Sequence, residues 1–409
     1  MTARILGPEG RGIYALPTID AGLVSALFTG LTSSVSYFML NKKVGRGAFA
    51  PAFLTAGIFV AMGSVGIVIL ATLANQRWAI APAIASLPFI ALMNISVGIL
   101  TGVKMVRYNG VVGLLSTVGT FTLMIVGFSF FSRTPTIAIA AWLINLAVLA
   151  GCVITVALYN SRHLPLVALP FREYFRFAAK LGAVNLLTLL NYRIDVYIVA
   201  MLTSPATLGI YTLAVAAAES LQTVAQVATI ITAPHIASLD RKAALALTSR
   251  CVRNNTAIAA LLCVIVAFAA PFLIQAVYGT RFMAMIPSLR VLLIGVVGLS
   301  GASPLSSFFT LKVGRPEISM VMASISAAIC LVVTILLLPR IGILGAAIGT
   351  AASYVFAQTA SIWFFCRNTG VSYGTVLFIT HDDLAFYRDV VLGGVRHVRA
   401  ALSSALLRP

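Results

Sequence analysis

Long apolar segments follow one another along almost the whole chain, separated by short polar stretches. A helix needs about 20 predominantly apolar residues to cross a hydrocarbon core roughly 30 Å thick. Alternation of apolar and polar positions with a period of two, which is typical of membrane β-strands, is not seen. The pattern therefore predicts an all-α integral membrane protein.

The apolar segments predict eleven transmembrane helices. They lie at residues 14–40, 48–74, 79–103, 110–131, 136–160, 177–201, 209–238, 254–278, 287–311, 317–338 and 341–366. The connections between them are short, so they leave no room for a separate soluble catalytic domain.

Composition agrees with this pattern, because 60% of the 409 residues are hydrophobic and only 9% are charged. Soluble domains carry about 25% charged residues. The net charge of +18 comes from Lys and Arg that lie mainly beside the apolar segments, where anionic lipid headgroups attract them. We therefore expect membrane lipids, and no nucleic acid, as partners. The five cysteines and four histidines have no metal-ligand or disulfide spacing, so we expect no metal site.

The distribution of the 28 Lys and Arg predicts the orientation of the chain. Twenty fall on one side of the membrane, two lie inside helices (Arg193 and Arg290), and six fall on the other side (Arg4, Arg11, Arg77, Arg133, Arg281 and Arg340). The positive side of a membrane protein is cytoplasmic. The C-terminus is therefore predicted to be cytoplasmic and the N-terminus, as given, periplasmic.

An internal repeat divides the chain into two similar halves. PEGRGIYAL, residues 8–16, and PATLGIYTL, residues 205–213, share five of nine positions at an offset of 197. Repeats of equal membrane orientation are a common transporter architecture. At this offset the helix at 177–201 maps before residue 1. We therefore expect a twelve-helix pattern of two parallel bundles that lacks its first helix.

The repeat predicts four regions. Residues 1–160 would form a first bundle of five spans, 161–176 an amphipathic cytoplasmic linker, 177–366 a second bundle of six spans, and 367–409 a basic amphipathic cytoplasmic tail. Mixed apolar and Arg-rich faces in the linker and the tail are suited to an anionic membrane surface.

Several motifs resemble those of one transporter family. ARILGPEGRGIYAL resembles the loop between the first two helices of bacterial polysaccharide-biosynthesis flippases, in the multidrug, oligosaccharidyl-lipid and polysaccharide exporter superfamily. YRIDVYIVAMLTSPATLGIYTLAVAAAESLQTVAQVATIITAPHIASL is similar to their seventh and eighth helices, and GVSYGTVLFITHDDLAFYRDV to their cytoplasmic end.

The resemblance implies a transporter, not an enzyme. It implies two bundles around a central cavity that opens alternately to each side of the bacterial inner membrane. The cargo would be a polyprenyl-pyrophosphate-linked oligosaccharide for O-antigen, capsule or exopolysaccharide, and polymerases and glycosyltransferases would be partners. No cofactor is implied, although some members couple transport to an ion gradient, which would be H⁺ or Na⁺. The missing first helix departs from the family pattern.

Two charges interrupt the apolar helix at 177–201. A charge at a helix centre costs about 2.5 to 3.5 kcal/mol, so Arg193 and Asp195 together cost roughly 5 to 7 kcal/mol on insertion. The eleven Leu, Ile, Val and Phe residues return roughly 3 to 7 kcal/mol. Two residues rotate a helix by about 200°, so these side chains need separate partners or a local unwinding. Arg193 is our candidate for binding the anionic cargo, because guanidinium matches phosphate geometry.

The next helix carries a polar stripe of Glu219, Gln222 and Gln226, spaced i, i+3 and i+7. Lipid would leave these groups unsatisfied, so the stripe should face a cavity or another helix. We interpret the three residues as substrate contacts. Asp195 and Asp20 are candidates for counter-ions or for carriers of a coupling cation, and Asp20 is expected to face the same cavity as Glu219. The alternative is that these charges pair across helices and fix the bundle.

Other functional classes stay open at this stage. A drug or cation antiporter of the same superfamily would have the same fold and another cargo. A membrane-embedded enzyme acting on lipid-linked sugars would need acidic residues in an extracytoplasmic loop, and Glu9 is the only acid predicted there. A non-transporting paralogue is the third alternative.

Overall fold

The structure, a computed structural model, describes residues 2–40, 42–73, 76–105 and 107–378. Within these ranges the chain is helical, and its only β-type pairing is an isolated bridge between Gly45 and Leu166. A long helix or a helix with short continuations lies at each of the eleven predicted spans. Among the described residues, nine helices are long and apolar enough to cross a membrane, or ten if one bent pair is counted. The prediction of an all-α membrane protein is confirmed.

The chain packs as two compact units. Unit 1 comprises Met1–Leu213, Pro271–Ile286 and Ile341–Ala346, and unit 2 comprises Ala214–Ala270, Pro287–Arg340 and Ala347–Pro409. The predicted regions at 1–160, 161–176, 177–366 and 367–409 stay a prediction, and most of the predicted tail lies outside the described residues.

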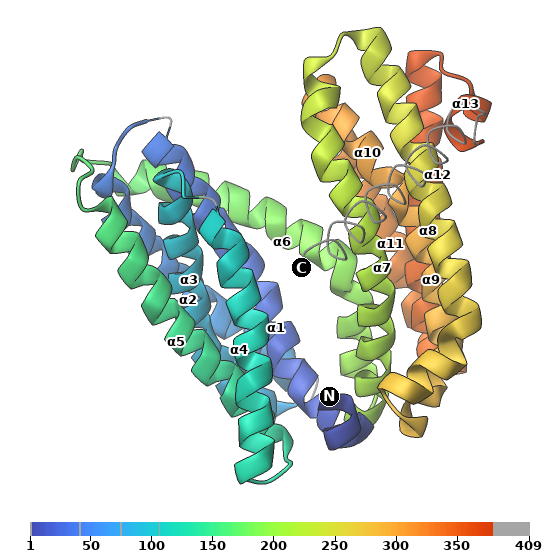
Figure 1. Ribbon diagram of the computed structural model, residues 1–409, viewed down its shortest axis with the longest axis horizontal. Helices are drawn as coiled ribbons and strands as arrows, with labels where there is room; N and C mark the ends of the chain where they lie inside the picture. Colours follow the sequence, from blue (N-terminus) through green and yellow to red (C-terminus); the bar gives the residue numbers. More distant parts are fainter. Residues whose placement is uncertain (1, 41, 74–75, 106, 379–409) are drawn as a thin grey trace, which may run out of the picture. The chain divides into compact units, whose positions relative to one another are not determined.

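Unit 1 is built on six long helices. They are α1 (Thr2–Leu40), α2 (Phe49–Leu73), α3 (Ile80–Gly102), α4 (Arg107–Phe130), α5 (Pro135–Ser161) and α6 (Phe171–Leu202). Helix α1 packs against α3 and α6, α3 packs against α5, and α4 runs beside α5 (Figure 1). The apolar core lies between α1, α2, α3 and α6 and includes Phe28, Leu31, Ile95 and Tyr174.

Glycines let α1 and α6 approach closely. A Cβ atom on Gly30 would lie 2.6 Å from the backbone nitrogen of Gly182, and one on Gly182 would lie 2.9 Å from the carbonyl oxygen of Leu27. Small residues at crossings bring two backbones together in membranes, where dispersion contacts drive association. Asn185 of α6 donates a hydrogen bond of 2.7 Å to Thr29 of α1 near the same crossing.

The two copies of the sequence repeat also meet within unit 1. A Cβ atom on Gly12 would overlap the carbonyl oxygen of Pro205, and one on Gly209 would overlap the carbonyl oxygen of Pro8. Gly12 and Gly209 are equivalent at the offset of 197, as are Pro8 and Pro205. The contact between the start of α1 and the start of α7 (Pro205–Ser238) is therefore reciprocal.

Unit 2 contains the remaining helices. They are the part of α7 from Ala214 onward, α8 (Arg241–Val277, whose end belongs to unit 1), α9 (Ile286–Ser300), α10 (Ala302–Ser307), α11 (Pro316–Ile341), α12 (Ile343–Thr369) and α13 (Tyr373–Leu377). A π-helical turn, η4 (Phe308–Lys312), follows α10. Gly295 and Gly298 let α9 pack directly on α12 at Ala351 and Val355.

Three single polar residues inside the predicted spans join helices by hydrogen bonds. Asn94 of α3 accepts a hydrogen bond from Thr32 of α1, and Asn145 of α5 donates to the carbonyl oxygen of Ser116 on α4. In unit 2, Gln358 of α12 donates to Thr256 of α8 and accepts from the backbone N–H of Gly301. Such interhelical hydrogen bonds satisfy polar groups that would otherwise face apolar surroundings.

The ends of several helices differ from the prediction. Helix α1 begins at Thr2 instead of residue 14, with a break at Gly7, whose φ is +70°. Helices α6 and α8 begin at Phe171 and Arg241, several residues before the predicted 177 and 254. Hydropathy marks only the apolar part of a helix, whereas backbone hydrogen bonding continues into polar sequence outside the hydrocarbon region. The span predicted at 287–311 is interrupted between α9 and α10, at Gly301.

Candidate functional site

Asp195, a predicted counter-ion, lies buried in unit 1 beside the second copy of the repeat. Its side chain is 2% exposed, and its Oδ2 accepts a hydrogen bond of 2.5 Å from the hydroxyl of Tyr211. Tyr211 belongs to the sequence PATLGIYTL at the start of α7 and is itself fully buried. A hydrogen bond therefore joins the charged segment of α6 to the second copy of the repeat. One function of Asp195 is to hold the start of α7 against α6.

Arg193 and Asp20, the other two candidates in unit 1, share a neighbour. Tyr197 of α6 donates a hydrogen bond of 2.7 Å to the carbonyl oxygen of Ile19 on α1, the residue before Asp20, and Arg193 lies one helical turn before Tyr197. Asp20 is 4% exposed, and Arg193 is half-buried. The structure thus gathers Asp20, Arg193 and Tyr197 between α1 and α6.

The charges on α6 follow a change in the direction of the helix. The segments Phe171–Leu187 and Tyr192–Leu202 are inclined by 67° to each other. Arg193 and Asp195 lie on the second segment, directly after the bend. The spacing of Arg193 and Asp195 predicted separate partners for the two side chains or a local unwinding of the helix. Tyr211 is a separate partner for Asp195.

The predicted polar stripe on α7 belongs to unit 2 and is unevenly exposed. Glu219 is half-buried, Gln222 is 5% exposed, and Gln226 is exposed. The amide nitrogen of Gln222 is buried and has no hydrogen-bond partner among the described residues. A buried polar atom without a partner costs about 1 to 3 kcal/mol, so this amide is suited to a ligand or to ordered water.

The candidates therefore form two groups. Asp20, Arg193 and Asp195 lie in unit 1, and Glu219, Gln222 and Gln226 lie in unit 2. Their roles as substrate or ion contacts, and a cavity common to Asp20 and Glu219, stay predictions. Sequence reasoning missed Tyr197 and Tyr211. The repeat did single out Tyr211, which is one of its five shared positions.

The described residues do not have the arrangement that a metal site needs, and Arg290 is the other arginine predicted inside a span. Within the described ranges, no three His, Cys, Asp or Glu side chains are arranged to hold a metal ion. Arg290 is exposed on α9, and its Nε donates a hydrogen bond of 3.1 Å to the carbonyl oxygen of Ala267. Arg290 therefore lies on the surface of unit 2.

Removal of the Tyr211 hydroxyl should weaken the fold. Tyr211→Phe is expected to lower the free energy of unfolding by about 1 to 3 kcal/mol, because the buried carboxyl group of Asp195 loses a hydrogen-bond donor. Thermal unfolding of the purified, detergent-solubilised protein measures the change. Tyr108→Phe, at an exposed tyrosine of α4, is the matched control. Equal stability of Tyr211→Phe and the control would show that the hydrogen bond contributes nothing.

Comparison with known families decides which family this chain belongs to. A family described as "Polysaccharide biosynthesis protein" matches residues 1–287, which is well over half of the chain. The chain belongs to this polysaccharide biosynthesis family. The family resemblance drawn from the motifs is thereby confirmed. An uncharacterized membrane protein of Methanocaldococcus jannaschii is 32% identical over 104 residues, which is 25% of this chain and only 20% of the archaeal protein.

Solved structures with the same fold are exporters and flippases. An inward-facing multidrug resistance MATE family transporter of the MOP superfamily matches with a TM-score of 0.68 and 16% identity, over 90% of this chain and 92% of the other. The lipid II flippase MurJ, in an inward closed conformation, matches with a TM-score of 0.61 and 13% identity, over 88% and 87%. A MOP superfamily transporter from Pyrococcus furiosus matches with a TM-score of 0.60 and 17% identity, over 88% of each chain.

These similarities show the fold of the polysaccharide biosynthesis protein. It is a multi-pass membrane protein with the fold of MATE transporters and of MurJ. Together with the family, the fold supports a membrane transporter.

Proposed function

We propose that this polysaccharide biosynthesis protein is a flippase that moves a polyprenyl-pyrophosphate-linked oligosaccharide across the bacterial inner membrane. The cargo would be consumed in making O-antigen, capsule or exopolysaccharide. The observation that carries the proposal is the family match over residues 1–287 in a chain with the fold of MurJ, whose name records a lipid-linked cargo. A flippase for lipid-linked sugars would account for both the polysaccharide biosynthesis family and the fold shared with a lipid flippase.

The interior charges support the same function. Arg193 contacts the pyrophosphate in this proposal, because it presents a permanently charged guanidinium on a transmembrane helix beside Asp20 and Tyr197. Gln222, with its buried amide nitrogen lacking a partner, contacts the sugar together with Glu219 and Gln226. Asp20 and Asp195 serve as counter-ions or bind a coupling H⁺ or Na⁺. The C-terminus is cytoplasmic and the N-terminus, as given, periplasmic.

The second candidate is a drug or cation antiporter, and one observation favours it. The TM-score with the multidrug MATE transporter, 0.68, exceeds the 0.61 with MurJ. The identities of 16% and 13% are both too low to carry a cargo from either protein to this chain. The polysaccharide family therefore favours the lipid-linked cargo. An enzyme acting on lipid-linked sugars has less support, since the fold neighbours are named as transporters and a flippase.

The direct test is a lipid extraction from cells that lack the protein. Completed lipid-linked oligosaccharide should accumulate and should be inaccessible to a glycan-binding probe added outside spheroplasts. Re-expression of the native chain should restore both the normal level and access. A parallel measurement of drug susceptibility separates the antiporter. If the level of lipid-linked sugars were unchanged and drug susceptibility increased, the antiporter function would be favoured and the flippase function would be wrong.

A further inference from the structure

A basic pocket lies in unit 1, and none of the interior charges lines it. It occupies about 720 Å³ between the end of α1 and the first turns of α6. Pockets of this size hold small organic ligands or lipid headgroups. Its walls combine cations with aromatic rings, and neither group has a role in the function proposed above.

The pocket is strongly basic. Four cations and one acid line it, namely Lys42, Arg172, Arg176, Lys180 and Glu173. All five are exposed, and in the described part of the chain no ion pair or side-chain hydrogen bond neutralises the cations. Arg172, Arg176 and Lys180 follow one another at i, i+4 and i+8, where like charges destabilise a helix. A bound anion would relieve this repulsion.

The start of α6 adds to the positive potential. Pro170 precedes the helix in an extended conformation, with φ −60° and ψ 128°, and no side chain caps the first turn. The partial positive charge of a helix N-terminus attracts anions and adds to the field of neighbouring cations. A guanidinium can bind two oxygens of one phosphate at once, so Arg172 and Arg176 are suited to a phosphate group.

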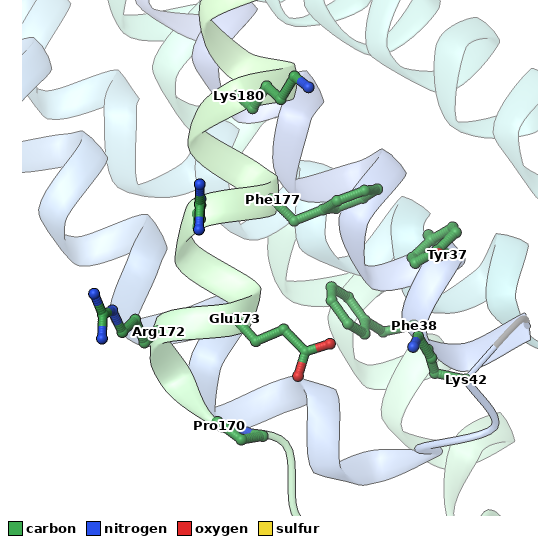
Figure 2. A pocket seen from close by; sticks show the side chains of 9 residues that line it. Tyr37, Phe38, Lys42, Pro170, Arg172, Glu173, Phe177 and Lys180 are labelled. Carbon is green, nitrogen blue, oxygen red and sulfur yellow. The ribbon is translucent and has the colours of Figure 1, made fainter.

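Aromatic rings form the other wall. Tyr37 stacks on Phe177 with ring centroids 4.6 Å apart, and Phe38 packs edge-on against both. Figure 2 shows Glu173, Phe177 and Lys180 on the side of α6 that faces Tyr37 and Phe38, while Arg172 projects away from these rings.

The exposed aromatic rings and the predicted depth of the pocket in the membrane both suit a lipid ligand. Tyr37 is 36% exposed, so an amphipathic surface adjoins the charges. The distribution of Lys and Arg puts this end of α1 and α6 on the predicted cytoplasmic side, at the level of the headgroups.

We propose that this pocket binds the phosphate group of a lipid in the cytoplasmic leaflet, and that this lipid is the polyprenyl-pyrophosphate-linked cargo. The proposal rests on the function proposed above. It assigns a capture site outside the interior charges. The cations bind the pyrophosphate, the aromatic wall contacts the adjoining sugar or prenyl chain, and Glu173 limits the affinity so that the cargo can leave for the interior.

The test is equilibrium binding of undecaprenyl pyrophosphate to the full chain in phosphatidylcholine nanodiscs. The triple variant Arg172→Ala, Arg176→Ala, Lys180→Ala should bind at least tenfold more weakly. The matched control removes three exposed cations on the same predicted side, Arg46, Arg107 and Arg162, and should stay within twofold of the native protein. Repeating the comparison on an Arg193→Ala background separates this pocket from the interior arginine.

A gain of binding provides a test that misfolding cannot imitate. Glu173→Gln removes the one acid of the pocket and should tighten binding severalfold. Native binding by the triple variant, or no change in Glu173→Gln, would overturn the site. If an equal amount of phosphatidylglycerol displaced undecaprenyl pyrophosphate, the pocket would be a site for bulk anionic lipid. The assignment of the cargo as its ligand would then be wrong. Binding does not require export, so failure of the pocket and failure of the flippase proposal are separate results.

Discussion

Arg193→Ala is expected to reduce polysaccharide export to the level of cells that lack the protein, while the amount of protein in the membrane stays within about twofold of normal. The alanine removes a guanidinium that lies on a transmembrane helix near Asp20 and Tyr197, and export in this proposal needs that group for the pyrophosphate. Export is measured as surface polysaccharide per cell, alongside the amount of the variant in isolated membranes.

Two further variants sharpen this result. Arg193→Lys keeps the charge and loses paired hydrogen bonding, so we expect export between those of alanine and the native residue. Arg290→Ala is the matched control, because Arg290 also lies within a helix but is exposed and bonded to the backbone of Ala267. Normal export by Arg193→Ala would remove Arg193 from the cargo pathway. Equal loss in both alanine variants would indicate a general effect of deleting an intrahelical arginine.

Gly12→Ala is expected to separate the start of α1 from the start of α7 and to lower both stability and export. The added Cβ atom would overlap a backbone carbonyl, that of Pro205, which cannot rotate away as a side chain can. Overpacking of this kind costs about 1 to 3 kcal/mol, and a backbone obstacle puts the expected loss near the upper limit. Thermal unfolding in detergent measures the loss, and Gly209→Ala should reproduce it against Pro8.

Gly22→Ala on the same helix is the control for this prediction. Apart from the backbone of its own helix, no atom of the described residues lies within 4 Å of a Cβ built on Gly22, so the change in helix propensity dominates there, and it favours alanine. Gly22→Ala should therefore keep native stability or gain slightly. If Gly12→Ala unfolded at the same temperature as Gly22→Ala, the close contact would not exist in the folded protein.

The helices were predictable because each buried span needs its own run of apolar residues. The ends were not, since the part of α1 after the break at Gly7 already includes Glu9 and Arg11, where hydropathy is low but the backbone is helical. The break at Gly301 also escaped prediction. There the backbone N–H of Gly301 bonds to Gln358 of another helix, and such a partner is not encoded in the local sequence.

For the site, sequence reasoning found the costly charges but not their neighbours. Arg193 and Asp195 stand out because intramembrane charges are rare and expensive. The hydrogen bond from Tyr211 to Asp195 and the hydrogen bond from Tyr197 to Ile19 depend on how α1, α6 and α7 pack. The same holds for the pocket at Lys42 and Arg172, whose residues come from two helices far apart in sequence.

The reciprocal contact of Gly12 with Pro205 and of Gly209 with Pro8 has an evolutionary consequence. The glycine of each repeat contacts the proline of the other repeat. Such a pair of equivalent contacts is typical of an isologous interface in a two-fold dimer. In a dimer of an ancestral single repeat, the contact between one glycine and one proline would have formed twice, once in each direction. After duplication and fusion the two glycines became free to diverge, yet each still limits the other's surroundings. Across homologues, positions 12 and 209 are therefore expected to vary together and to keep small residues as a pair.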